Sequence, residues 1–345
     1  MSHFYFGRKG ACWAFNLKGH VGSCVWRLTS RSGFKWEYPL LLWESPLTNL
    51  SASLGCGRRS RAHSRPSQLI CSLLRGTTQH FLHPPKMTAP PNLSHAAPQQ
   101  QRFLVLFDFD ETIINESSDD AVVRALPGQH LPDWLRNSYR EGHYNEHMQK
   151  VLVYMAEQGV SEDSIRSAVE KIQPSPGLLN LFQYLHSHQQ DFELAVVSDA
   201  NMYIIETWLE RAGVRHLFRK IFTNPASFDN SGCLMLLPFH SHSCSCCPEN
   251  MCKQVILREY LAGRQKERGG APFQKVFYIG DGANDICPSL ALGPRDTAFP
   301  RRDFPMHRLL LERQQSQTAK FKANVVPWVS GEDIVDCLKK IMEER

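Results

Sequence analysis

The sequence predicts an α/β fold built on a doubly wound parallel sheet. Residues 103–107 (FLVLF) are five consecutive apolar residues, a pattern typical of a strand buried on both faces. Residues 275–279 (KVFYI) give a second strand of this kind near the other end of the chain. Strand and helix patterns alternate between the two, which is the signature of successive βα units.

The first hundred residues differ from the rest of the chain. Residues 1–101 show little helical or strand periodicity, so we predict an unstructured basic N-terminal extension, with Met87 as a second candidate start. This part carries twelve Lys or Arg and two acids, whereas the remainder carries 27 and 32. The net charge of +5 therefore belongs to the extension, and we predict no nucleic-acid binding by the folded part.

The segment of residues 117–175 interrupts the sheet pattern and predicts a small helical cap. Helical spacing is present at 121–126, 147–156 and 161–172, and the last of these begins with a capping sequence, SEDS.

The core, residues 102–330, resumes after the cap. We expect helices at 178–188, 203–212 and 253–261 and strands at 192–197, 221–223 and 276–279. An insert at about 224–252 combines a hairpin, whose turn is DNSG, with a group of cysteines and histidines. Residues 331–345 are predicted to form a C-terminal helix.

Carboxylates follow both predicted strands. Asp108 and Asp110 are two positions apart, so on an extended backbone they project the same way from the carboxyl end of the first strand. Asp281 and Asp285 follow the second strand. Such close carboxylates repel unless a cation or a shared proton separates them, which indicates a hard metal ion such as Mg²⁺, a proton-transfer role, or both. Taken alone, the Asp-x-Asp pattern could also be a solvated turn or a calcium loop.

These motifs resemble the haloacid dehalogenase superfamily of phosphotransferases. Its signature is DxDx[TV] early in the chain and GD(x)nD late, and both are present in that order. Ser198, after the apolar run LAVV, matches the second motif. Lys253 is the best match for the third, with Lys220 and Lys275 as weaker candidates. The resemblance covers roughly residues 102–328 and implies a Rossmann-like core with a cap inserted after the first motif.

Longer matches resemble the vertebrate phosphoethanolamine/phosphocholine phosphatases. The segments FDFDETI, VSDAN, PFHSHSC and GDGANDICP carry this likeness. It implies Mg²⁺-dependent hydrolysis of small amine-bearing phosphomonoesters, in matrix vesicles and in skeletal mineralisation. Pyridoxal phosphate or phosphoserine as substrate remains an alternative, and so does a non-catalytic binding protein on the same fold.

The resemblance also implies roles for the carboxylates. Asp108 would be the nucleophile that forms an aspartyl phosphate, and Asp110 the general acid and base. Mg²⁺ would be held by Asp108, the backbone carbonyl of Asp110, and Asp281.

Further residues would bind the substrate. Ser198 and Lys253 would bind the phosphoryl oxygens, with Lys253 also stabilising charge in the transition state, and Asp285 would orient Lys253 or the metal shell. Asp119 and Asp199 would bind the cationic head group of the substrate. From the residues alone, Asp119 would be a helix cap and Asp199 a turn residue.

The chain has eleven cysteines and no apolar run near the roughly 20 residues that cross a bilayer. Without a secretory signal we expect a cytoplasmic protein with reduced thiols. Six residues of metal-ligand type lie close together in the insert: His240, His242, Cys244, Cys246, Cys247 and Cys252. They are compatible with a zinc site or with reduced structural thiols.

Overall fold

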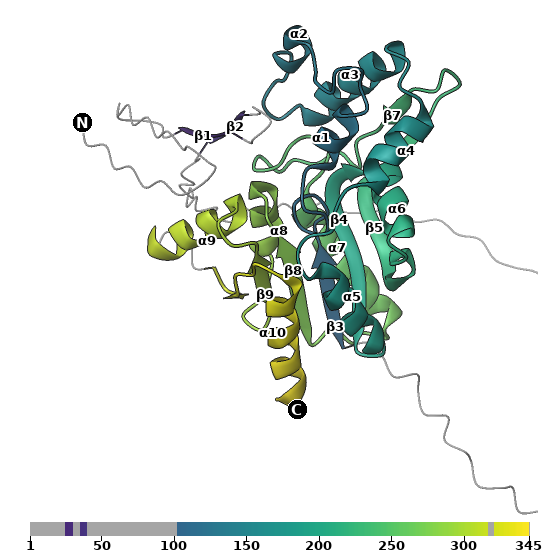
Figure 1. The fold of residues 1–345 in the computed structure, drawn as a ribbon. Coiled ribbons are helices and arrows are strands. Elements are labelled where there is room, and N and C mark those ends of the chain that lie inside the picture. The colour runs from purple at the N-terminus through teal and green to yellow at the C-terminus, as the bar shows by residue number, and fades with distance from the viewer. Residues whose placement is uncertain (1–24, 30–34, 40–101, 317–320, 345) are drawn as a thin grey trace, which may run out of the picture. The chain divides into compact units, whose positions relative to one another are not determined.

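A six-stranded parallel sheet forms the centre of the protein (Figure 1). The computed structural model describes residues 25–29, 35–39, 102–316 and 321–344. The strand order is β10-β9-β8-β3-β4-β5, and every neighbouring pair is parallel. The strands are β3 (Phe103–Phe107), β4 (Phe192–Asn201), β5 (Phe218–Asn224), β8 (Lys275–Gly280), β9 (Thr297–Pro300) and β10 (Asn324–Val325).

This order confirms the predicted doubly wound α/β fold. In chain order the sheet grows outward from β3 to β4 and β5, and then from β8 on the other side of β3 to β9 and β10. The direction of growth therefore reverses between β3 and β8. In open sheets of this kind, ligands bind in the crevice at the carboxyl ends of the strands where the order reverses.

Helices cover both faces of the sheet. Val105 and Phe107 of β3 belong to one apolar cluster with α5 (Leu178–Ser187), α6 (Met202–Arg211) and α10 (Gly331–Glu343). Leu104 and Leu106 point to the opposite side, into a cluster with α7 (Lys253–Glu267) and α9 (Pro305–Ser316). Burial on both faces explains why the β3 sequence is apolar throughout rather than alternating.

Four helices occupy the segment between β3 and α5: α1 (Ser118–Val123), α2 (Asp133–Arg136), α3 (Tyr144–Glu157) and α4 (Glu162–Glu170). Ser117 caps α1 and Ser161 caps α4, each by accepting a bond from a backbone N–H of the first turn. Figure 1 shows α1, α2 and α3 gathered at one end of the sheet.

The insert after β5 contains a hairpin that contacts this helical segment. Strands β6 (Ala226–Phe228) and β7 (Leu234–Leu236) are antiparallel. The side chain of Gln149, from α3, accepts a hydrogen bond from Leu236 N at 2.6 Å and donates to Leu234 O at 3.3 Å. These bonds tie the hairpin to the cap.

Within the N-terminal extension, the structure describes two strands. Strands β1 (Val25–Thr29) and β2 (Lys35–Pro39) form a two-stranded sheet. We expected no regular structure there, although Trp, Tyr, Val and Thr all favour strands. The rest of residues 1–101 lies outside the described residues, so the expectation of an unstructured extension stays a prediction for them.

Several elements, all but one of them after residue 280, were not predicted. They are β9, β10, α9, the 3₁₀ turns η1 (Arg215–Leu217) and η2 (Ala283–Asp285), and α8 (Ile286–Ser289). Strands of two to four residues are too short to show a period. Among the described residues, no helix combines the length and apolar character required to cross a bilayer.

Candidate active site

The pairing of β3 with β8 brings the two groups of carboxylates together. Phe107 lies opposite Ile279, and Asp108 N donates a hydrogen bond to Ile279 O at 2.9 Å. Carboxylate oxygens of Asp108, Asp281 and Asp285 all lie within 4.8 Å of one another. These three side chains come from residues that are at most 9% exposed. The site therefore lies at the point where the strand order reverses.

Lys253 is the cation inside this cluster. It is the first residue of α7 and is only 2% exposed. Its Nζ lies 2.8 Å from Asp108 Oδ2 and 2.8 Å from Asp285 Oδ1. Burial opposes the charged form of Lys253, but attraction to these two carboxylates outweighs it and raises the lysine pKa well above its usual range.

Lys220 and Lys275, the weaker candidates for the third motif, lie elsewhere. Lys220 is exposed on β5, and Lys275 is the first residue of β8, at the opposite end of the strand from Asp281. The structure therefore favours Lys253.

Asp285 is held by donors on both of its oxygens. Oδ1 accepts from Lys253 and, at 2.7 Å, from the hydroxyl of Tyr278. Oδ2 accepts from the backbone N–H of Asp281 at 3.1 Å and of Gly282 at 2.9 Å. These four bonds make Asp285 a residue that orients Lys253 and the loop after β8.

The same loop requires glycine at its first position. A Cβ atom placed on Gly280 would lie 2.4 Å from Asp285 Oδ2, closer than such atoms approach. The glycine at the end of β8 thus lets Asp285 fold back against the strand.

Asp108 and Asp281 are the carboxylates suited to a metal ion. Burial and the charge of Asp285 raise the pKa of Asp108 to about 7, although Lys253 lowers it. Burial and the charge of Asp108 raise the pKa of Asp281 well above its usual range. Crowded, buried carboxylates with a single lysine between them have a deficit of positive charge, and an oxygen donor set of this kind fits Mg²⁺.

Asp110 lies on the cap side of the site. Its Oδ1 accepts a hydrogen bond from Ser118 N, the first residue of α1, at 2.9 Å. Burial and the charge of Asp119 raise the pKa of Asp110 well above its usual value. A carboxyl group with a raised pKa can hold a proton at neutral pH, as a general acid must.

The two remaining acids predicted from the sequence also act on this site. Asp119 Oδ2 accepts from the hydroxyl of Tyr144 at 2.7 Å, and burial raises the pKa of Asp119 to about 6. Asp199 Oδ2 accepts from the side chain of Asn284 at 3.0 Å. The charge of Asp199 contributes to the raised pKa of both Asp108 and Asp119, so the three carboxylates share one electrostatic environment.

Ser198 lies near the end of β4, beside the end of β3. It is fully buried, and its Oγ accepts from Ala200 N at 3.3 Å. The side chain of Asn224 holds the irregular end of β4 by donating to the carbonyls of Asp199, at 2.7 Å, and Ala200, at 2.9 Å. This places Ser198 on the same sheet edge as Asp108.

Sequence reasoning missed Arg301 in the site's support. Arg301 is 8% exposed and donates to the carbonyl of Glu111 and the side chain of Asn115. Glu111 has a φ of 52°, an uncommon conformation for a residue with a side chain. Arg301 therefore holds the strained loop after Asp110, and only the three-dimensional contact between positions so far apart in the chain reveals it.

Tyr278 and Asn284 are further site residues that sequence reasoning did not find. Tyr278 lay within an apolar run and gave no sign of its bond to Asp285. Asn284 was part of a recognised motif, but its contact with Asp199 joins two different strand ends.

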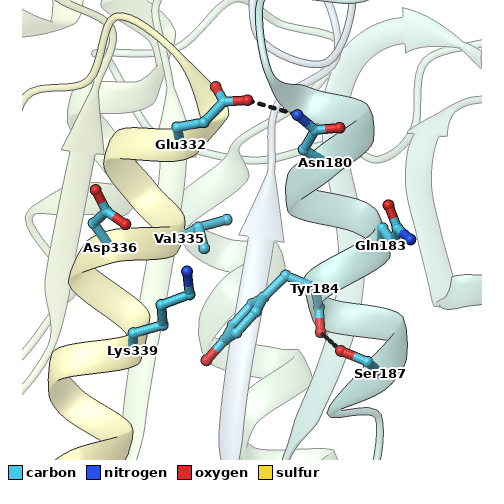
Figure 2. Close-up of a pocket in the computed structure, with 8 residues that line it drawn as sticks. All are labelled: Asn180, Gln183, Tyr184, Ser187, Glu332, Val335, Asp336 and Lys339. Atoms are coloured by element: carbon cyan, nitrogen blue, oxygen red, sulfur yellow. Dashed lines mark hydrogen bonds between the residues drawn. The ribbon is translucent and has the colours of Figure 1, made fainter.

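A surface groove between α5 and α10 is separate from this cluster. Figure 2 shows side chains of both helices lining it, with Asn180 donating to Glu332 at 2.7 Å. None of the candidate catalytic or metal-binding residues lines the groove. The candidate active site is therefore the carboxylate cluster.

The predicted Cys/His cluster is only partly brought together. Cys244, Cys247 and Cys252 converge, and Cys287, which the sequence analysis did not include, joins them. Cys246, His240 and His242 are not part of this group.

A protein-family model agrees with this geometry. The family described as "Putative Phosphatase" matches residues 103–342, which contain the whole cluster. The chain belongs to this phosphatase family.

Known proteins align with most of this part of the chain. A "Probable phosphatase phospho1" of Danio rerio is 56% identical over 76% of this chain and 95% of its own length. A "Phosphoethanolamine/phosphocholine phosphatase" of Gallus gallus is 50% identical over 72% of this chain and 92% of its own. A human "Pyridoxal phosphate phosphatase" is 36% identical over 70% of this chain and 100% of its own. As a member of the family, this chain is a phosphatase.

Proposed function

We propose that this phosphatase hydrolyses small amine-bearing phosphomonoesters, phosphocholine and phosphoethanolamine above all, with Mg²⁺ as cofactor. The observation that carries the proposal is the pair Asp119 and Asp199, whose charges act on the site although phosphoryl transfer does not need them. Extra negative charge beside a phosphate is unfavourable unless it meets a cation, and an amine or quaternary ammonium on the leaving group supplies one. The chicken relative is named for this substrate class.

The first chemical step is assigned to Asp108. One carboxylate oxygen attacks phosphorus, the P–O bond to the leaving group breaks, and an aspartyl phosphate, which is an acyl phosphate, forms on Asp108. Asp110 gives its proton to the leaving alkoxide. Lys253, 2.8 Å from Asp108 Oδ2, orients the nucleophile and offers positive charge to the phosphoryl oxygens, to which Ser198 also donates.

The second step regenerates the enzyme. Asp110, now deprotonated, accepts a proton from a water molecule that attacks phosphorus, and inorganic phosphate leaves Asp108. When bound by Asp108, Asp281 and the Asp110 carbonyl, Mg²⁺ would offset the repulsion between the anionic nucleophile and the anionic substrate. Asp285 keeps Lys253 in place throughout, through the ion pair at 2.8 Å.

The cap would complete the head-group site. Tyr144 of α3 donates to Asp119 at 2.7 Å, and this bond fixes the carboxylate while leaving an aromatic ring close to it. A quaternary ammonium can be attracted both by a carboxylate and by the face of an aromatic ring. By resemblance, the phosphate released here would serve skeletal mineralisation in matrix vesicles.

Pyridoxal phosphate is a second candidate substrate, favoured by the human relative that is 36% identical over 70% of this chain. It differs from phosphocholine in having an aromatic ring and no quaternary ammonium. Hydrolysis of phosphocholine should therefore depend on Asp119 and Asp199 more strongly than hydrolysis of pyridoxal phosphate, and this difference distinguishes the two candidate substrates.

Phosphate release tests the proposal. The purified chain is offered phosphocholine, phosphoethanolamine, pyridoxal phosphate, phosphoserine and an uncharged aryl phosphate, each with and without Mg²⁺. We expect the two amine-bearing esters to give the highest kcat/KM and all release to need Mg²⁺. A preference for pyridoxal phosphate would replace the substrate assignment, and undiminished release without divalent ions would contradict the metal requirement.

Variants then test the head-group acids. Asp119→Asn and Asp199→Asn are expected to lower kcat/KM for phosphocholine about tenfold or more relative to the aryl phosphate, because a partly desolvated charge pair is lost. Asp133→Asn is the matched control, since this acid lies in the cap with its side chain 87% exposed. Equal losses on both substrates would show that these acids support the fold or the metal instead.

A further inference from the structure

We infer that Cys244, Cys247, Cys252 and Cys287 form a structural zinc site, separate from the carboxylate cluster. The four sulfur atoms all lie within 4.8 Å of one another. Cys244 Sγ is 3.7 Å from Cys247 Sγ and 3.8 Å from Cys287 Sγ. Four sulfurs bound tetrahedrally to zinc at about 2.3 Å are about 3.8 Å from each other, so the spacing is that of a tetrathiolate site.

The sulfur spacing does not fit a disulfide. All four cysteines are free, and the sulfur–sulfur distances of 3.7 and 3.8 Å are far longer than the roughly 2.05 Å of an S–S bond. Cys252 and Cys287 are at most 7% exposed, while Cys244 and Cys247 are half-buried. Four thiols that converge from separate segments in this way form a closed ligand set.

The nearby histidines support the loop rather than complete the site. His240 Nε2 accepts from the backbone N–H of Cys252 at 3.0 Å. His242 Nδ1 accepts from the N–H of Cys244 at 3.2 Å, and its Nε2 lies 2.9 Å from Pro248 O, so both ring nitrogens are engaged. Each histidine thus bonds the backbone of a cysteine in the cluster, as residues around a metal site commonly do.

The position of the cluster gives it a structural role. Cys252 directly precedes Lys253, and Cys287 follows Asp285 by two residues, in α8. Gln254 Nε2 donates to Cys287 O at 3.0 Å, so the two segments already touch. A metal held by all four thiolates would fasten the start of α7 to α8, next to the Lys253–Asp285 ion pair.

The two clusters would select different ions. Thiolates are soft ligands that favour zinc, whereas the carboxylate cluster offers only hard oxygen atoms. The site is therefore expected to hold zinc even when the protein also needs Mg²⁺.

Metal content tests the site directly. The full chain, produced with zinc in the medium and purified under reducing conditions, should carry about one zinc per chain by elemental analysis. X-ray absorption at the zinc edge should show four sulfur ligands at about 2.3 Å. Cys244→Ser and Cys287→Ser should lose most of the zinc. Cys246→Ser should retain it, because Cys246 is exposed and outside the cluster.

The site would be overturned by wild-type protein without stoichiometric zinc, by nitrogen or oxygen ligands in the absorption spectrum, or by a disulfide between cluster cysteines. Equal loss of zinc in Cys246→Ser would do the same. The absorption spectrum of the wild-type protein decides the question even if the serine variants fail to fold. These readouts do not involve phosphate release, so their outcome is independent of the proposed phosphatase substrate.

Discussion

At the scale of single residues, the main feature of the site is a group of carboxylates that are buried close together. Burial raises the pKa of Asp108, Asp110, Asp119 and Asp281, and one buried lysine ammonium, that of Lys253, contacts this group among the described residues. The negative charge of these carboxylates must therefore be offset by partners. A metal ion, a transferable proton and a cationic head group are three such partners, and they match the three roles that the proposal assigns.

The pKa of Asp119 leads to a pH-dependent substrate preference. Burial raises this pKa to about 6, so the carboxylate is neutral below that pH and charged above it. Only the charged form attracts an amine head group. The ratio of kcat/KM for phosphocholine over an aryl phosphate should therefore rise as pH increases through about 6 and level off above it.

A pair of pH profiles measured with the two substrates checks this expectation. Taking the ratio removes the titration of groups that serve both substrates, such as Asp108 and Asp110. In Asp119→Asn the ratio should be low and flat with pH. A wild-type ratio that does not change with pH would show that Asp119 is not the head-group acid.

At the scale of elements, the sequence predicted what is local and missed what is distant. The buried strands β3 and β8 and the acids that follow them are visible because each apolar run ends abruptly in a short segment that carries two aspartates. The cap of α4 at Ser161 is equally local, whereas the cap of α1 at Ser117 was not predicted. Partners such as Arg301 and Cys287 come from positions that only strand pairing and helix packing bring near the site, and no short pattern marks them.

The loop after β8 gives a test at this scale. Gly280→Ala places a methyl group 2.4 Å from Asp285 Oδ2, so Asp285 must move and its bonds to Lys253 and Tyr278 must weaken. We expect the free energy of unfolding to fall by about 1–3 kcal/mol. Phosphate release should also fall, because Asp285 no longer orients Lys253.

Gly263→Ala is the matched control for that variant. Gly263 lies inside α7, and a Cβ atom there would meet nothing within 4 Å. Alanine in a helix interior is favoured over glycine by up to about 1 kcal/mol, so this variant should be slightly more stable. Urea denaturation compares the two, and a Gly280→Ala protein as stable as the control would refute the close packing of Asp285.

At the scale of the whole molecule, the doubly wound sheet determines where chemistry can occur. Six parallel strands direct their carboxyl ends to one edge, and the reversal of strand order separates the connections that leave β3 and β8. The cap helices follow β3 in the chain. The hydrogen bond from Ser118 N to Asp110 joins the first of them to the loop that follows β3. In the proposed function, the sheet would supply the nucleophile and the metal ligands, and the head-group acids would come from both the cap (Asp119) and the end of β4 (Asp199).

The free energy of unfolding should change with pH as Asp108 titrates. In the metal-free protein the pKa of Asp108 is about 7, against an ordinary value of 3.8. Between these values the folded protein holds a proton that the unfolded chain has released, so stability falls as pH rises. If Mg²⁺ binds Asp108 as proposed, it would replace that proton, and its stabilising effect should therefore grow with pH up to about 7.

Thermal unfolding with and without Mg²⁺ measures this effect. The increase in Tm on adding Mg²⁺ should be small near pH 5 and larger above about pH 7. In Asp281→Asn the increase should shrink at every pH, because one metal ligand is weakened. An increase in Tm that is the same at both pH values would contradict competition between Mg²⁺ and the proton on Asp108.

One comparison decides whether Asp108 is the nucleophile. Phosphate release from phosphocholine is measured for the wild-type protein and Asp108→Asn with saturating Mg²⁺, with Tm as the check on folding and Asp133→Asn as the exposed control. If Asp108 is the nucleophile, we expect Asp108→Asn to stay folded and to lose nearly all turnover, since an amide neither attacks phosphorus nor binds Mg²⁺ well. A folded Asp108→Asn protein that keeps a tenth or more of the wild-type rate would contradict it.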